Sequence, residues 1–150
     1  AALVLGGTNV FEVPPGGVTR DFEFTVPVSG RLLAVGGHLH DHGAWVRLED
    51  AATSREIATV RPIRDGDGNV VGMSRQVLAL FGPGPHLRAG HRYRLRVRYE
   101  NPTSATLSGM MGLMAGLFAP DDIRAWPAVD RSSPDYLADL AGVRGARLEP

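Results

Sequence analysis

Hydrophobic and polar residues alternate along much of this chain, and turn-forming residues separate the alternating segments. Over residues 92–99, tyrosine, leucine and valine take every second position and arginine takes the positions between them. Phenylalanine and valine alternate with polar residues in the same way over residues 21–28. Because side chains i and i+2 of a strand share one face, this period of two predicts strands with one buried face.

Shorter runs of the same kind predict further strands. They comprise residues 9–13, 31–40, 45–48, 56–61, 76–81 and 106–118. Residues 64–69, Arg-Asp-Gly-Asp-Gly-Asn, have the composition of a hairpin loop. Short strands separated by turns every ~8–12 residues predict an all-β fold, an antiparallel β-sandwich.

The alternating pattern ends after residue 118. Residues 119–150 are rich in proline, aspartate and arginine. Ser132 and Asp135 have the spacing of a helix capping box, and Pro134 suits a first helical turn. We therefore predict a single domain over residues 1–118 and a short helical or irregular C-terminal tail over 119–150, which packs on the domain or serves as a linker.

Composition narrows the classes of function. Sixteen basic and sixteen acidic residues cancel, so no field attracts nucleic acid, and we expect no nucleic-acid partner. No apolar run reaches the ~18 residues of a membrane span. The absence of cysteine excludes disulfides and thiolate metal sites. The chain begins Ala-Ala without Met, which is typical of a mature chain after signal cleavage or of a trimmed domain.

Three of the five histidines occupy every second position in one run, as His38, His40 and His42. In a strand, His38 and His40 leave the backbone side by side and form a chelating pair. Asp41 and His42 also have turn character, and a turn there would place His42 at the rim of the site instead of making it a third nitrogen ligand. The alternative for the pair is two hydrogen-bonded histidines without a metal. His86 and His91 are interpreted as surface histidines.

Methionines supply the other candidate ligands. Two imidazoles suit zinc, copper, nickel or iron, and an added thioether favours Cu(I). Met110 and Met114 share one face of the predicted strand 106–118, and Met111 lies on the other. One of these two rows of side chains is expected to face the hydrophobic core, where methionine fills gaps.

The two motifs together resemble the C-terminal domain of the copper type II, ascorbate-dependent monooxygenases, the family of peptidylglycine α-hydroxylating monooxygenase and dopamine β-monooxygenase. The resemblance covers about residues 18–118 and rests on His38-Leu39-His40 and on Gly109-Met110-Met111-Gly112-Leu113-Met114. It implies a jelly-roll-like sandwich and a copper ion held by His38, His40 and Met110, the last from the family's Met-x-x-Leu segment.

Two features depart from that family. Its enzymes have two copper domains and stabilising cysteines, whereas this chain has the length of one domain and no cysteine. Secreted plant and bacterial relatives of the stress-induced nodulin type carry Gly-His-Leu-His-Asp-Gly-Gly, and here His42 replaces the first glycine of the final pair.

The expected function is therefore that of a single-domain secreted or periplasmic mononuclear copper protein. Its His-His-Met site would bind Cu(I) and Cu(II) for copper binding, delivery or electron transfer, with a copper-delivery or redox protein as partner. The alternative is an oxygen-activating mono-copper monooxygenase-like enzyme, and a zinc-stabilised sandwich is third. The carrier is preferred because the sequence identifies no general base and no substrate pocket.

Overall fold

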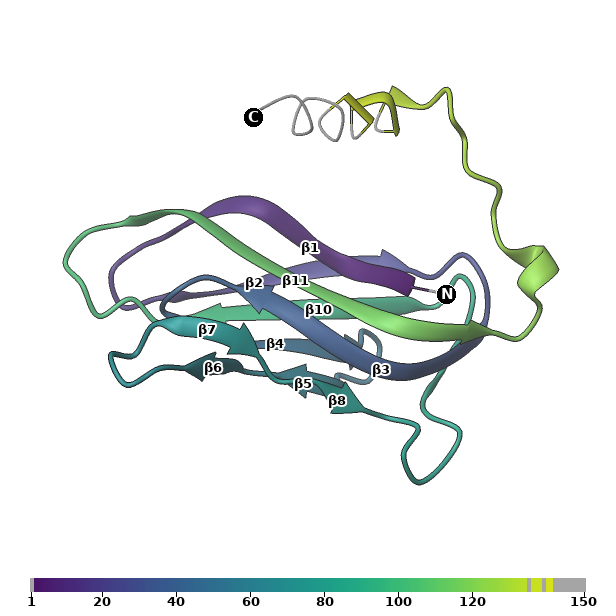
Figure 1. Ribbon diagram of the computed structural model, residues 1–150, viewed down its shortest axis with the longest axis horizontal. Helices are drawn as coiled ribbons and strands as arrows, with labels where there is room; N and C mark the ends of the chain where they lie inside the picture. Colours follow the sequence, from purple (N-terminus) through teal and green to yellow (C-terminus); the bar gives the residue numbers. More distant parts are fainter. Residues whose placement is uncertain (1, 135, 139, 142–150) are drawn as a thin grey trace.

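Two antiparallel β-sheets form the body of the protein in a computed structural model that describes residues 2–134, 136–138 and 140–141, with side chains from Val10 onward (Figure 1). The first sheet has the spatial order β1 (Ala2–Val13), β11 (Leu107–Pro120), β3 (Gly30–Leu39) and β8 (Gln76–Val77), and β9 (His86–Leu87) also pairs with β3. The second has the order β2 (Val18–Thr25), β10 (Arg92–Tyr99), β4 (Gly43–Asp50) and β5 (Glu56–Val60). A separate hairpin consists of β6 (Pro62–Arg64) and β7 (Val70–Met73).

Consecutive strands alternate between the two sheets from β1 to β4 and again from β9 to β11. β1, β3 and β11 belong to the first sheet, and β2, β4 and β10 belong to the second. Each sheet therefore interleaves early and late strands, in the order of a jelly roll built from two Greek keys. The predicted all-β, jelly-roll-like antiparallel sandwich is confirmed. The hairpin loop predicted over residues 64–69 is observed over 65–69, because Arg64 is the last residue of β6 and pairs with Val70.

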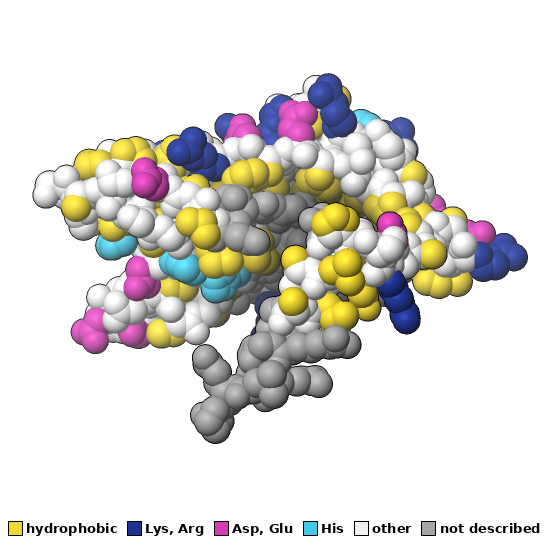
Figure 2. Space-filling view, turned by 90° about the horizontal axis from the view of Figure 1, so that it is seen from above, with side chains coloured by type: hydrophobic (Ala, Val, Ile, Leu, Met, Phe, Trp, Pro, Cys, Tyr) yellow, Lys and Arg dark blue, Asp and Glu magenta, His cyan; other side chains and the backbone are white. Residues whose placement is uncertain are grey.

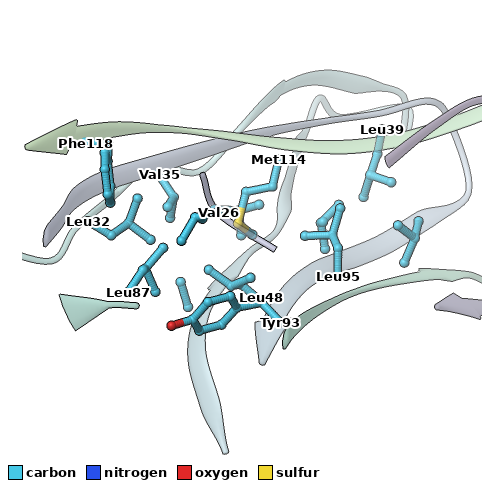
Figure 3. Close-up of a cluster of buried hydrophobic side chains, with 14 of the residues drawn as sticks. Val26, Leu32, Val35, Leu39, Leu48, Leu87, Tyr93, Leu95, Met114 and Phe118 are labelled. Carbon is cyan, nitrogen blue, oxygen red and sulfur yellow. The ribbon is translucent and has the colours of Figure 1, made fainter. Parts of the chain in front are cut away.

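The core lies between the sheets, and the alternation of β10 explains how it forms. Its tyrosines, leucine and valine point inward and are at most 2% exposed, where they meet Met114 and other apolar side chains (Figure 3). Its arginines lie on the outer face of the second sheet, beside the acidic side chains of β2. Arg94 is 3.0 Å from Glu23 and Arg96 is 2.9 Å from Asp21.

The strand predicted over residues 76–81 is wrong beyond Val77. The backbone N–H groups of Leu78 and Ala79 both donate to the Leu33 carbonyl, at 2.8 and 3.1 Å. Because two successive donors share one acceptor, the regular ladder cannot continue and the chain turns away. Phe81 is left 98% exposed. The two-residue strand β9 has no sequence prediction, because a period of two cannot be recognised over two residues.

Strand β11 continues through Pro120 and leads to a 3-10 turn, η1 (Ile123–Ala125), capped by Asp122. The ring of Trp126 then lies 6.1 Å from that of Phe118, so this part of the tail packs against the core. No helix within the described ranges is long and apolar enough to cross a lipid bilayer.

A helical segment follows at residue 134, with Pro134 in its first turn as predicted. Its cap is Ser133, however, whose Oγ accepts a 3.1 Å hydrogen bond from the Tyr136 N–H. Ser132 instead donates its hydroxyl to Asp130 at 2.6 Å, so it is engaged in the preceding turn. Asp135, the second member of the predicted capping box, lies outside the described residues.

Candidate metal centre

The histidine pair lies at the end of β3, close to the turn into β4. Leu39 is 3% exposed and points into the core, so the flanking histidines share the outer face. The rings of His38 and His40 have centroids 5.1 Å apart and are perpendicular to each other. His38 is exposed and His40 is half-buried. The predicted side-by-side arrangement of the two imidazoles is confirmed.

Neither imidazole of this pair makes a hydrogen bond or an ion pair with another side chain in the described part of the chain. Figure 2 shows histidine side chains gathered along a hollow between two lobes at one end of the molecule. His86 and His91 differ from this pair. His86 Nε2 lies 2.7 Å from Asp121 Oδ2, and His91 Nε2 lies 2.7 Å from Asp50 Oδ2.

A tyrosine hydroxyl connects the histidine strand to the methionine strand. The His40 N–H donates to the Tyr99 hydroxyl at 2.8 Å, and that hydroxyl donates to the Met111 carbonyl at 2.6 Å. Burial raises the pKa of the Tyr99 hydroxyl above its ordinary value of 10.0, so the group stays protonated and keeps both contacts. Sequence analysis placed Tyr99 in the core, and no signal in the sequence indicated that its hydroxyl reaches the end of β3.

The two faces of β11 separate the methionines. Leu113 pairs with His38 across the antiparallel ladder, so the two side chains share the outer face. Met111 precedes Leu113 by two residues and belongs to the same row, just beyond the last pair of the ladder, Gly112 with Leu39. Met110 belongs to the other row and packs against the hydrophobic core.

The row of β11 side chains that faces the core also explains why position 112 is a glycine. Gly112 lies against Val97, and a Cβ added at Gly112 would come within 2.4 Å of a valine methyl carbon. Met114, next in this row, is 0% exposed. Glycine therefore allows the two sheets to approach closely at this point.

The chain turns directly after the pair. The Gly43 N–H donates to the His40 carbonyl at 3.1 Å, and His42 has a positive φ of 68°. The Asp41 carboxylate accepts a 2.6 Å hydrogen bond from the Val70 N–H. The turn alternative for these residues is confirmed, and His42 lines a cavity beside the turn.

The described residues contain no group of three or more His, Asp or Glu side chains arranged to hold a metal ion. Two same-face imidazoles remain, and they can provide two nitrogen ligands of a copper, zinc or nickel site. A third protein ligand would have to come from outside that set of residue types, and Met111 belongs to the outer-face row of Leu113, the ladder partner of His38. Comparisons with protein-family models, curated proteins and solved structures gave no match.

Proposed function

We propose that this protein binds one copper ion through His38 and His40 and acts as a secreted or periplasmic copper-binding protein, in copper delivery or electron transfer. One observation carries the proposal: two imidazoles face each other on an outer sheet face, without a carboxylate partner in the described residues. A histidine that serves only the fold usually has its ring nitrogens hydrogen-bonded when it is partly buried.

Copper is preferred over zinc because of the neighbouring methionine. A thioether is a soft ligand that favours Cu(I), whereas structural zinc sites use four nitrogen, oxygen or thiolate ligands. The family resemblance implied Met110 as this ligand, and that assignment stays a prediction. The ladder favours Met111 instead, because its row of side chains lies on the same outer face of the sheet as the histidines. Met110 packs against the core.

The solvent exposure of His38 supports the delivery role. A copper donor or acceptor protein can approach an exposed ligand directly, and transfer then needs no opening of the fold. The same exposure favours the second candidate, an oxygen-activating mono-copper enzyme, because a site with two or three protein ligands keeps a coordination position open for a small molecule.

Metal analysis of the purified full chain, followed by titration with Cu(I) and Cu(II) against a chromogenic chelator, tests the proposal. We expect one copper per chain, with tighter binding of Cu(I). Oxygen consumption with ascorbate as reductant separates the two candidates, since a carrier consumes oxygen no faster than its His38→Ala variant. Zinc binding with no measurable copper affinity would refute both.

A further inference from the structure

A second site lies on the other side of the β3–β4 turn. A cavity of about 780 Å³ opens between this turn, the β6–β7 hairpin and the end of β10. These segments lie at the left-hand end of the ribbon in Figure 1. The volume of the cavity falls within the range of small-molecule pockets, roughly 300–1,000 Å³. Four segments far apart in sequence contribute to its wall, including Gly16 of the β1–β2 turn.

Positive charge dominates the wall of this cavity. Its lining residues include three arginines, Arg61, Arg64 and Arg98, and a single acidic residue, Glu100. Glu100 is 3.9 Å from Arg98, so it offsets one of the three charges at most. The whole chain has equal numbers of acidic and basic residues, and the excess in this cavity is therefore local.

The arginines differ in how they are held. Arg64 donates to the carbonyls of Gly43 and Gly68, at 2.6 and 2.8 Å, which orients its side chain without neutralising it. Arg61 is exposed, and its guanidinium has no hydrogen bond or ion pair with any described residue. The cavity thus combines one oriented cation with one that has donors available for a ligand.

Two acidic side chains of the neighbouring turns, Asp41 and Asp65, are not part of the cavity wall. Asp41 accepts its hydrogen bond from the Val70 N–H, and Asp65 accepts from the Asn69 N–H at 2.9 Å. The Asp65 carboxylate therefore stabilises the hairpin loop, and the Asp41 carboxylate links the β3–β4 turn to the start of β7. A guanidinium has a planar set of donors that matches the two oxygens of a carboxylate or phosphate.

We propose that this cavity binds a small molecule through its carboxylate or phosphate group, with Arg61 as the main contact and Arg64 and Arg98 supporting it. Ala44, Pro62 and Pro102 also line the wall and suit an uncharged body attached to the anionic group. This proposal does not depend on copper binding, because none of the three arginines belongs to the metal centre.

Amide NMR of the full chain, stripped of metal by a chelator and dialysed, tests the proposal with two probes, inorganic phosphate and succinate. We expect saturable shifts at Gly16, Gly43 and Gly68 with one of the probes, and the tighter probe identifies the anionic group. Sodium chloride at equal ionic strength is the control for general screening. Absence of saturable shifts with both probes would overturn the proposal.

Substitutions locate the site. Arg61→Gln should weaken binding of the tighter probe at least about tenfold, since it removes a charge-assisted hydrogen bond to the anionic group. Arg61→Lys keeps the charge but loses the planar donors, so it should weaken binding less. The matched control is Arg131→Gln, on the tail and exposed. Equal affinities of Arg61→Gln and Arg131→Gln would overturn the assignment.

Discussion

Four of the five histidines of this protein belong to two structural environments. His86 and His91 each have an aspartate oxygen 2.7 Å from Nε2. His38 and His40 have only each other, with ring centroids 5.1 Å apart, and no acidic partner among the described residues. Residue type is the same in both environments, so the difference arises from the partners that the fold brings to each ring.

An aspartate partner changes what a histidine can do. The Asp50 carboxylate accepts hydrogen bonds from His91, Thr53 and the Ala52 N–H, and the contact with His91 contributes most to a pKa of about 2. A ring held in this way stabilises a turn between strands. A ring without such a partner keeps a nitrogen lone pair available to a metal ion.

The largest effect that follows from this comparison concerns copper affinity. Replacing both His38 and His40 with Ala should lower copper affinity by more than ~100-fold, because changes in groups that only support metal ligands already cost about 10–100-fold. The melting temperature should change little, since neither ring has a partner in the described structure. Chelator competition and thermal unfolding measure the two quantities.

The matched control exchanges the other two histidines, as His86→Ala with His91→Ala. This variant should retain copper and unfold at a lower temperature, which is the reverse of the first result. If both double variants lost copper equally, the aspartate-paired histidines would belong to the metal site and the comparison would fail.

The second prediction distinguishes Met111 from Met110. Met111→Leu should weaken Cu(I) binding on the order of tenfold and leave Cu(II) binding nearly unchanged, because the lost thioether prefers the reduced ion. Met110→Leu is the control, and as a volume-conserving change against the core it should cost less than about 1.5 kcal/mol of stability. The opposite result, loss of Cu(I) affinity in Met110→Leu alone, would support the ligand implied by the family resemblance.

The third prediction concerns acid stability through His91. The pKa of Asp50 lies below its ordinary value of 3.8 in the folded chain, so its stabilising effect is present above about pH 4 and is lost as the pH falls towards 2. His91→Phe preserves a ring against Tyr93, whose centroid is 5.0 Å away, but removes the main cause of the lowered pKa. The variant should be less stable near neutrality and lose less stability between about pH 5 and about pH 2.5.

Urea unfolding at the two pH values measures this difference. His86→Phe is the control, because the His86–Asp121 pair is more exposed and screened by solvent. An unchanged loss of stability on acidification in His91→Phe would show that this ion pair does not govern the Asp50 carboxyl.

Patterns local in sequence predicted much of this structure. The period of two predicted β10 at its observed bounds, and the spacing of His38 and His40 predicted that their rings share a face. The partners of the other histidines were not predictable, because Asp121 is 35 residues from His86 and Asp50 is 41 residues from His91. Such contacts depend on which strands become neighbours in the jelly roll.

Strand β11, which carries three methionines, shows the same limit of prediction from local sequence patterns. Alternation showed that Met110 and Met111 lie on opposite faces, but not which face is the core. That choice follows from the pairing of Leu113 with His38. The cavity lined by Arg61, Arg64 and Arg98 was also not predicted from the sequence, because four separate segments form its wall.

The smallest expected effect concerns His42, which belongs to neither environment. Its φ of 68° lies in the left-handed region that glycine adopts readily and other residues adopt at a cost of about 1–2 kcal/mol. Glycine also loses more backbone entropy on folding, by roughly 0.5–1 kcal/mol relative to alanine. His42→Gly should therefore stabilise the fold by a net amount on the order of 0.5 kcal/mol.

Measurements of copper affinity distinguish whether His42 lies at the rim of the metal site or is a copper ligand. If His42 is a rim residue, His42→Gly keeps both the affinity and the number of nitrogens seen in the Cu(II) spin-resonance spectrum while the urea midpoint rises slightly. His42→Ala is the control, because it removes the ring but retains a Cβ at the positive φ and so should not stabilise the fold. Loss of a nitrogen ligand in both variants would instead make His42 a third copper ligand and place all three histidines of the run in the metal site.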